Sequence, residues 1–227
     1  MDQTEMKIAA ARVALAEVRD GMRLGLGTGS TAAEFVRLLA SAGLRNVRCT
    51  CTSENTETLA NSLGIATFKL AELAPLDLAV DGADALDEKL RLIKGGGGAL
   101  LREKIVEQAA RRFLVIADKS KVVQTFAGQK LPVEVTPFAR EVLEQRFADL
   151  QPVLRLRDGA PRVTDEGHLI LDVIVPADRD IAEVVAWVRD QAGVVETGFF
   201  PREATEAVVA GAGGVRRMRR AAGPAAG

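Results

Sequence analysis

The chain has 227 residues, of which 48% are hydrophobic and 27% charged, as is typical of a globular protein with a substantial core. Its 30 basic and 31 acidic side chains leave a net charge of −1, and only 4% of its residues are aromatic. This composition argues against a nucleic-acid partner and against base-stacking surfaces. No apolar run reaches the ~20 residues that cross a bilayer, and no signal-peptide pattern opens the chain. We therefore expect a cytoplasmic protein without a membrane partner.

Cysteine and histidine are too few for a zinc site built from these residues. Cys49 and Cys51 lie two apart in a strand-like stretch, which places both on one face, and His168 is the only histidine. A structural zinc site needs about four such ligands. The sequence predicts buried strand thiols and no Cys/His metal site, and it leaves open a magnesium site made of carboxylate oxygens.

Apolar strands alternate with helices in the first half of the chain. Strands are expected at 22–26, 47–52, 76–80 and 113–117, and helices at 4–19, 32–40, 56–63 and 100–111. Thr4 is the predicted N-cap of the first helix and Gly21 its stop. The alternation predicts an α/β fold, a Rossmann-like parallel sheet with helices on both faces.

The pattern changes near residue 125. Residues 131–137 contain two prolines among alternating apolar residues, and helices are expected at 139–150 and 180–190, with strands at 153–156 and 169–175. This predicts a smaller α+β, ferredoxin-like domain at 128–198, with 1–127 and 199–227 forming a catalytic domain. The arginine-rich end and its Ala/Gly/Pro extension are interpreted as a frayed tail rather than a nucleic-acid arm.

Polar clusters follow the strands of the first domain, where open parallel sheets bind ligands. They span 25–31, 53–55, 81–84 and 118–121, and a glycine-rich loop spans 94–98. The cluster at 25–31 precedes a helix, so its backbone N–H groups and the hydroxyls of Thr28, Ser30 and Thr31 can bind an anion. Its spacing departs from the dinucleotide fingerprint and from the P-loop, which favours a small phosphate; a plain tight turn is the alternative.

The other clusters supply carboxylates and cations. Asp81 and Asp84 follow a buried strand, where helix capping is the alternative. Lys94 precedes four glycines, which suit close backbone approach to a ligand unless the segment is only a flexible loop. Glu103 falls near the start of a helix, where a solvated side chain is the default. Lys121 is either a second phosphate cation or surface charge.

These motifs together resemble ribose-5-phosphate isomerase A. The motifs of that family occur here in the same order, as the runs GLGTGSTAAEFV, DLAVDGAD, IKGGGGALLREKIV, ADKSKVV and LPVEVTPFA. The similarity continues through VTDEGHLILDV and GVVETGFF. The sequence departs from the family at Ala85, where an acidic residue is usual, and at Glu166 and His168, where asparagines are common. None of these positions matches a catalytic residue of the family.

The resemblance implies a homodimeric isomerase that interconverts D-ribose 5-phosphate and D-ribulose 5-phosphate in the pentose phosphate pathway, without cofactor or metal. It implies that Glu103 is the base, that Lys94 stabilises developing charge, and that Asp81 and Asp84 hold sugar hydroxyls, Asp81 also moving hydroxyl protons. The implied substrate-binding residues are Thr28, Gly29, Ser30, Thr31, Asp81, Gly82, Ala83, Asp84, Lys94, Gly95, Gly96, Gly97 and Lys121, with Lys7 as a further phosphate ligand. The helix start near Glu103 predicts that its carboxylate is ionised at neutral pH.

Two other functions fit parts of this pattern. A sugar-phosphate sensor would normally carry a helix-turn-helix segment, for which the residues before the first glycine loop are too few. An acyl-CoA transferase-like enzyme of similar fold would use a glutamate nucleophile. The pairing of DGAD with KGGGG favours the isomerase.

Overall fold

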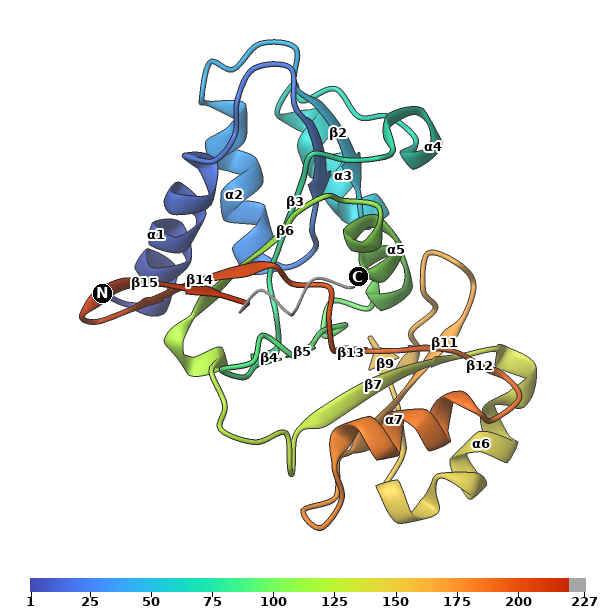
Figure 1. Ribbon diagram of the computed structural model, residues 1–227. Helices are drawn as coiled ribbons and strands as arrows, with labels where there is room; N and C mark the ends of the chain where they lie inside the picture. Colours follow the sequence, from blue (N-terminus) through green and yellow to red (C-terminus); the bar gives the residue numbers. More distant parts are fainter. Residues whose placement is uncertain (221–227) are drawn as a thin grey trace, which may run out of the picture.

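The computed structural model describes residues 1–220, and Figure 1 shows a larger α/β unit above a smaller one. The larger unit is built on a six-stranded sheet of order β15-β14-β6-β3-β1-β2, parallel except for its terminal hairpin. Its strands are β1 (Arg23–Leu26), β2 (Arg48–Cys51), β3 (Leu78–Asp81), β6 (Phe113–Asp118), β14 (Glu206–Gly211) and β15 (Gly214–Arg219). The predicted α/β class is confirmed, with one antiparallel strand at the sheet edge.

Helices cover both faces of this sheet (Figure 1). Leu24 and Leu26 of β1 pack with Phe35 on one face, whereas a Cβ at Gly25 would lie 2.6 Å from Val106 on the other. Glycine at this position lets the helix that carries Val106 approach the strand. On the first face lie α1 (Gln3–Leu15), α2 (Ser30–Ala40) and α3 (Glu54–Ser62), and on the second α4 (Leu70–Leu73) and α5 (Leu100–Gln108).

The first helix begins earlier than its composition suggests. Asp2, not Thr4, is its N-cap, because the Asp2 carboxylate accepts the Glu5 N–H and the Glu5 carboxylate accepts the Asp2 N–H, both at 2.8 Å. This capping box satisfies two N–H groups that the helix leaves unpaired. The helix ends at Leu15, before the predicted stop at Gly21.

A three-stranded sheet of order β13-β5-β4 covers part of β6. It consists of β4 (Ala85–Leu86), β5 (Leu92–Ile93) and β13 (Phe199–Phe200). Leu92 and Phe200 pack against Phe113 and Val115 of β6. Lys94 directly follows β5, and its N–H donates to the Gly198 carbonyl at 2.8 Å, so this small sheet fixes where the Lys94 side chain begins.

The smaller unit has an antiparallel sheet of order β12-β7-β11-β8. Its strands are β7 (Lys130–Val135), β8 (Val153–Leu154), β11 (Leu169–Ile174) and β12 (Val194–Thr197), and α6 (Arg140–Arg146) and α7 (Ile181–Arg189) pack into its core. The helix expected at 139–150 is shorter, because 3₁₀ turns flank α6 on both sides. The expected strand at 153–156 is interrupted at Arg155, and β9 (Leu156–Arg157) forms a hairpin with β10 (Ala160–Pro161). The domain boundaries proposed above stay a prediction.

Residues 214–219 form β15, so the arginine-rich end is ordered up to Arg219. The prediction of a frayed tail is wrong for these residues. Arg217 and Arg219 pair with Glu206 of β14, and Arg217 also with Glu17. These ion pairs and the strand ladder order the segment. The Ala/Gly/Pro extension lies outside the described residues. None of the helices within 1–220 is long and apolar enough to cross a membrane.

Candidate active site

A polar pocket lies at the carboxyl ends of β1, β3 and β6, where the strand order reverses between β1 and β3. Ligands of open α/β sheets bind at such reversal points. The pocket is lined by Gln3, Lys7, Thr28, Gly29, Ser30, Thr31, Gly82, Ala83, Asp84, Lys94, Gly95, Gly96, Gly97, Glu103 and Lys121. The structure thus brings together every predicted site residue except Asp81, which is buried against Lys94.

The loop after β1 is locked to the end of β3. A Cβ at Gly27 would lie 2.0 Å from the Asp81 carboxyl carbon, so only glycine leaves room for this side chain. Oδ1 of Asp81 accepts the N–H groups of Thr28 at 3.0 Å and Gly82 at 2.6 Å. The Asp81 carboxylate therefore holds both loops that border the pocket.

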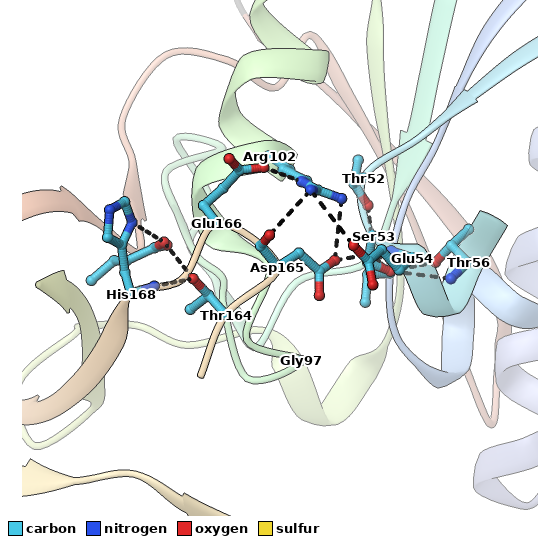
Figure 2. Close-up of polar contacts among 12 residues, drawn as sticks. Thr52, Ser53, Glu54, Thr56, Gly97, Arg102, Thr164, Asp165, Glu166 and His168 are labelled. Atoms are coloured by element: carbon cyan, nitrogen blue, oxygen red, sulfur yellow. Dashed lines mark hydrogen bonds and ion pairs between the residues drawn. The ribbon is translucent and has the colours of Figure 1, made fainter. Parts of the chain in front are cut away.

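The cluster at 53–55 supports the pocket from outside it. The Thr28 hydroxyl lies 2.7 Å from both Thr52 Oγ1 and Ser53 Oγ. Ser53 also caps α3 by accepting the Thr56 N–H at 3.1 Å, and Figure 2 shows Ser53 and Thr56 side by side. These hydroxyls fix the Thr28 side chain and do not line the pocket.

Cations gather at one end of the pocket. Lys7 of α1 donates from Nζ to Ser30 Oγ at 3.0 Å, and Lys121 lines the same pocket from the 3₁₀ turn after β6. Ser30 begins α2, and the preceding Gly29 has φ +110°, which suits glycine. The Lys7 ammonium at the start of α2, with Lys121 lining the same pocket, favours a phosphate. Gln3, which the sequence pattern did not single out, also lines the pocket.

A buried ammonium and three buried carboxylates form a cluster, of which Lys94 and Glu103 line the pocket. Lys94 Nζ lies 2.9 Å from Asp81 Oδ2, 3.2 Å from Glu107 Oε1 and 3.8 Å from Glu103 Oε2, and it donates to the Gly82 carbonyl at 2.6 Å. All four side chains are at most 3% exposed. Glu103 is therefore not a solvated helix residue. Glu107 was not among the predicted site residues, although its spacing of four from Glu103 puts both on one face of α5.

The protonation of this cluster is set mainly by burial. Burial raises the pKa of Glu103 to about 8, although the Lys94 ammonium opposes the shift. Burial likewise raises the pKa of Asp81 and of Glu107 above their ordinary values. Burial lowers the pKa of Lys94, but its three carboxylate neighbours outweigh this and raise it, so Lys94 stays charged. The prediction that the helix N-terminus keeps Glu103 ionised at neutral pH is wrong, because desolvation dominates.

The glycine loop between β5 and α5 has a fixed conformation. Asp84 Oδ2 accepts the Gly96 N–H at 2.6 Å, and a Cβ at Gly96 would lie 2.6 Å from Asp84 Oδ1. Gly95 has φ +102°, a conformation that side-chain-bearing residues rarely adopt. Asp84 therefore shapes this loop and also lines the pocket.

The residues that depart from the family pattern have partners of their own. Glu166 accepts a hydrogen bond from Arg102 Nε at 2.5 Å, and His168 Nδ1 lies 3.0 Å from Glu134 Oε1 (Figure 2). Ala85 begins β4 and is buried in an apolar cluster, which leaves no room for a solvated acid. None of the three lines the pocket.

Both cysteines are free thiols of β2, as predicted, but only Cys49 is buried and Cys51 is half-buried. Burial raises the pKa of both Cys49 and Cys51 to about 12, so both stay neutral thiols at pH 7. Within residues 1–220, no group of three or more His, Cys, Asp or Glu side chains is arranged to hold a metal ion.

Comparison with known proteins gives consistent matches. The family model of ribose 5-phosphate isomerase A (phosphoriboisomerase A) matches residues 48–214. Ribose-5-phosphate isomerase A of Agrobacterium fabrum is 49% identical, over 96% of this chain and 99% of the relative. The solved structure of the Methanocaldococcus jannaschii enzyme is 37% identical, with a TM-score of 0.88 over 95% of this chain and 98% of that one. A D-ribose-5-phosphate isomerase solved with phospho-erythronic acid is 34% identical, with a TM-score of 0.90 over 97% of this chain and 100% of that one.

The fold, the polar pocket and these matches define an aldose–ketose isomerase of the α/β class. The chain belongs to the ribose-5-phosphate isomerase A family, as its motifs indicated.

Proposed function

We propose that the pocket converts D-ribose 5-phosphate to D-ribulose 5-phosphate, and back, by moving a proton between C2 and C1 in the pentose phosphate pathway. The observation that carries this proposal is the placement of buried Glu103 beside Lys94, in the same pocket as the cations Lys7 and Lys121. A related isomerase binds phospho-erythronic acid, whose carboxylate resembles the paired oxygens of an enediolate.

The substrate phosphate binds at the cationic end. Lys7 and Lys121 supply positive charge, and Ser30 and Thr31 supply hydroxyl and N–H donors at the start of α2. Binding energy gained at this remote group holds the reacting carbons in place. The sugar chain then extends toward Asp84 and the glycine loop.

Glu103 is the base. Its carboxylate removes the proton from C2, which leaves an enediolate, and the same group returns the proton to C1 while a proton moves from O2 to O1. A base is most effective when its pKa lies near the working pH. The pKa of about 8 that burial gives to Glu103 meets this condition.

Lys94 acts mainly through its charge. Its Nζ donates to Gly82 O, and Asp81 Oδ2 and Glu107 Oε1 lie 2.9 Å and 3.2 Å away as ion-pair partners. The ammonium therefore stabilises the developing enediolate through its charge. N–H groups of the glycine loop supply the direct hydrogen bonds. Direct contact of Asp81 with sugar hydroxyls stays a prediction; its buried position favours a role in holding Lys94 and Thr28.

We also propose a homodimer in the cytoplasm that needs no cofactor, on the strength of the family resemblance. Light scattering on the purified protein tests the dimer. The reaction itself is tested by following ketose formation from ribose 5-phosphate and proton exchange at C1 in deuterated water. Turnover with exchange supports the enediolate route. Binding without turnover would instead support the sugar-phosphate sensor.

A further inference from the structure

Three successive carbonyls of the glycine loop are held by two arginines from the smaller unit. Arg155 Nη1 donates to Gly95 O at 2.5 Å and to Gly96 O at 3.3 Å. Arg162 Nη2 donates to Gly97 O. Arg155 lies between β8 and β9, and Arg162 directly follows β10. The loop that borders the pocket is thus oriented by residues outside the six-stranded sheet.

Arg155 is itself held rigidly. Its guanidinium forms a two-pronged ion pair with Asp172 of β11, with Nε 2.9 Å from Oδ2 and Nη2 bonded to Oδ1. The two side chains are 11% and 7% exposed. The Arg155 N–H also donates to Ile170 O on the same strand at 2.9 Å. A planar guanidinium bound this way has one orientation, which aims Nη1 at the glycine loop.

Holding these carbonyls determines where the N–H groups point. In a trans peptide the C=O and N–H bonds point in opposite directions, so the Gly97 N–H points away from Arg155. The Gly96 N–H is bound to Asp84, and the Gly98 N–H to Gly95 O at 2.9 Å. The Gly97 N–H has no acceptor among residues 1–220, and Gly97 lines the pocket. The Gly95 N–H likewise has no acceptor among these residues, but it shares its peptide with the Lys94 carbonyl, to which neither arginine donates. The Gly97 N–H is therefore the free loop donor whose direction Arg155 sets.

A second contact fixes the segment that carries Arg162. Figure 2 shows Arg102 of α5 reaching the turn that contains Asp165 and Glu166, with Gly97 drawn close to this turn. Arg102 Nη1 lies 3.4 Å from Asp165 Oδ2, whose carboxylate also accepts the Glu54 N–H at 2.9 Å. The turn is therefore tied to both α5 and α3.

We propose that Arg155 is a positioning residue of the isomerase, which orients the Gly95 and Gly96 carbonyls so that the Gly97 N–H meets the substrate oxygen that becomes negative. The proposal rests on the pocket being the substrate site. Binding of phospho-erythronic acid to the parent protein tests that assignment separately, before any variant is considered.

Two variants test the role of Arg155. R155K keeps a positive charge beside Asp172 but cannot bind the carboxylate and the carbonyls together. R155M/D172N removes both charges, so no unpaired ion stays buried. Arg157 is 68% exposed on the adjacent strand, so R157K is the matched control. The measurements are kcat and KM for ribose 5-phosphate and the Kd of phospho-erythronic acid and of inorganic phosphate.

We expect kcat to fall about 10- to 100-fold in both Arg155 variants. Deleting an oxyanion donor outright lowers kcat by ~10²–10³-fold, and misorienting one should not cost more. KM and the Kd of inorganic phosphate should stay within about threefold, while phospho-erythronic acid binds more weakly by a factor similar to that in kcat. R157K should match the parent. The proposal is overturned if kcat and phospho-erythronic acid binding are retained in either folded variant. A rise in KM alone, or equal loss of inorganic phosphate binding, would also overturn it, because the pocket as a whole would then have changed.

Discussion

Lys94 Nζ lies 2.9 Å from Asp81 Oδ2, and the two side chains are only 2% and 1% exposed. Glu107 and Glu103 complete the surroundings of this ammonium at 3.2 Å and 3.8 Å. Burying a charge is costly unless it is paired, and one ammonium cannot offset three ionised carboxylates. The cluster therefore holds protons at neutral pH, and its protonation governs both catalysis and stability.

Activity should not depend on a metal ion. The three buried carboxylates surround the Lys94 ammonium, which supplies the positive charge beside the reacting carbons. Prolonged treatment with a chelator should leave kcat/KM for ribose 5-phosphate unchanged. A loss of activity that magnesium restores would contradict this expectation.

The pH dependence of kcat/KM should report the raised pKa of Glu103. Because burial disfavours the carboxylate, the base is ionised only above a pKa of about 8. Activity should therefore rise about tenfold per pH unit up to that value and then level off. Phosphate monoesters titrate near pH 6, roughly two units lower, so the two groups can be separated. A profile already flat from pH 6 to 9 would show that Glu103 ionises normally or is not the base.

The phosphate contacts should control affinity. Replacing Lys7 or Lys121 with methionine removes one charge-assisted contact, worth roughly 1.5–3 kcal/mol, so KM should rise about 10- to 150-fold. Unphosphorylated ribose should be a poor substrate for the same reason. Lys89, exposed and outside the pocket, provides the control K89M. If K7M and K121M both bind substrate like K89M, the cationic end does not hold the phosphate.

Glu107 should make the protein less stable as pH rises. The pKa of Glu107 is raised well above 4.5 in the folded protein. Unfolding therefore releases a proton at any pH between the pKa of Glu107 in the unfolded chain and its pKa in the folded protein. Stability contributed by the protonated form is therefore lost with rising pH, by at most about 1.4 kcal/mol per unit. E107Q cannot titrate, so its stability relative to the parent should increase from pH 5 to pH 8 in urea unfolding. The exposed Glu141 provides the control E141Q. A difference that does not vary with pH would contradict the buried acid.

Local patterns in the sequence predicted most of the fold and the pocket. Continuous apolar runs at β3 and β6 are what a sheet covered on both faces requires, and their polar ends mark the ligand side. The Lys94 loop was recognisable because four successive glycines have no use in a helix or strand. Local patterns gave the wrong prediction for β15, because its arginines suggested a solvated tail. In the structure Arg217 pairs with Glu17 and Glu206, which lie far from it or on the neighbouring strand.

What could not be predicted depends on contacts between distant segments. The raised pKa of Glu103 results from burial by neighbours that its helix sequence does not contain. Arg155 lies 60 residues from the Gly95 carbonyl that it holds, in a stretch with no motif of its own. Only the packing of the smaller unit against α5 brings these groups together.

The central claim is that Glu103 transfers the proton, and E103Q tests it most directly. Glutamine keeps the size of the side chain but cannot act as a base, while Lys94 and the phosphate contacts still hold substrate. The account predicts that kcat of the folded variant falls ~10²–10⁴-fold with KM nearly unchanged. A kcat within about threefold of the parent, measured at pH 8, would contradict it and remove Glu103 from the mechanism.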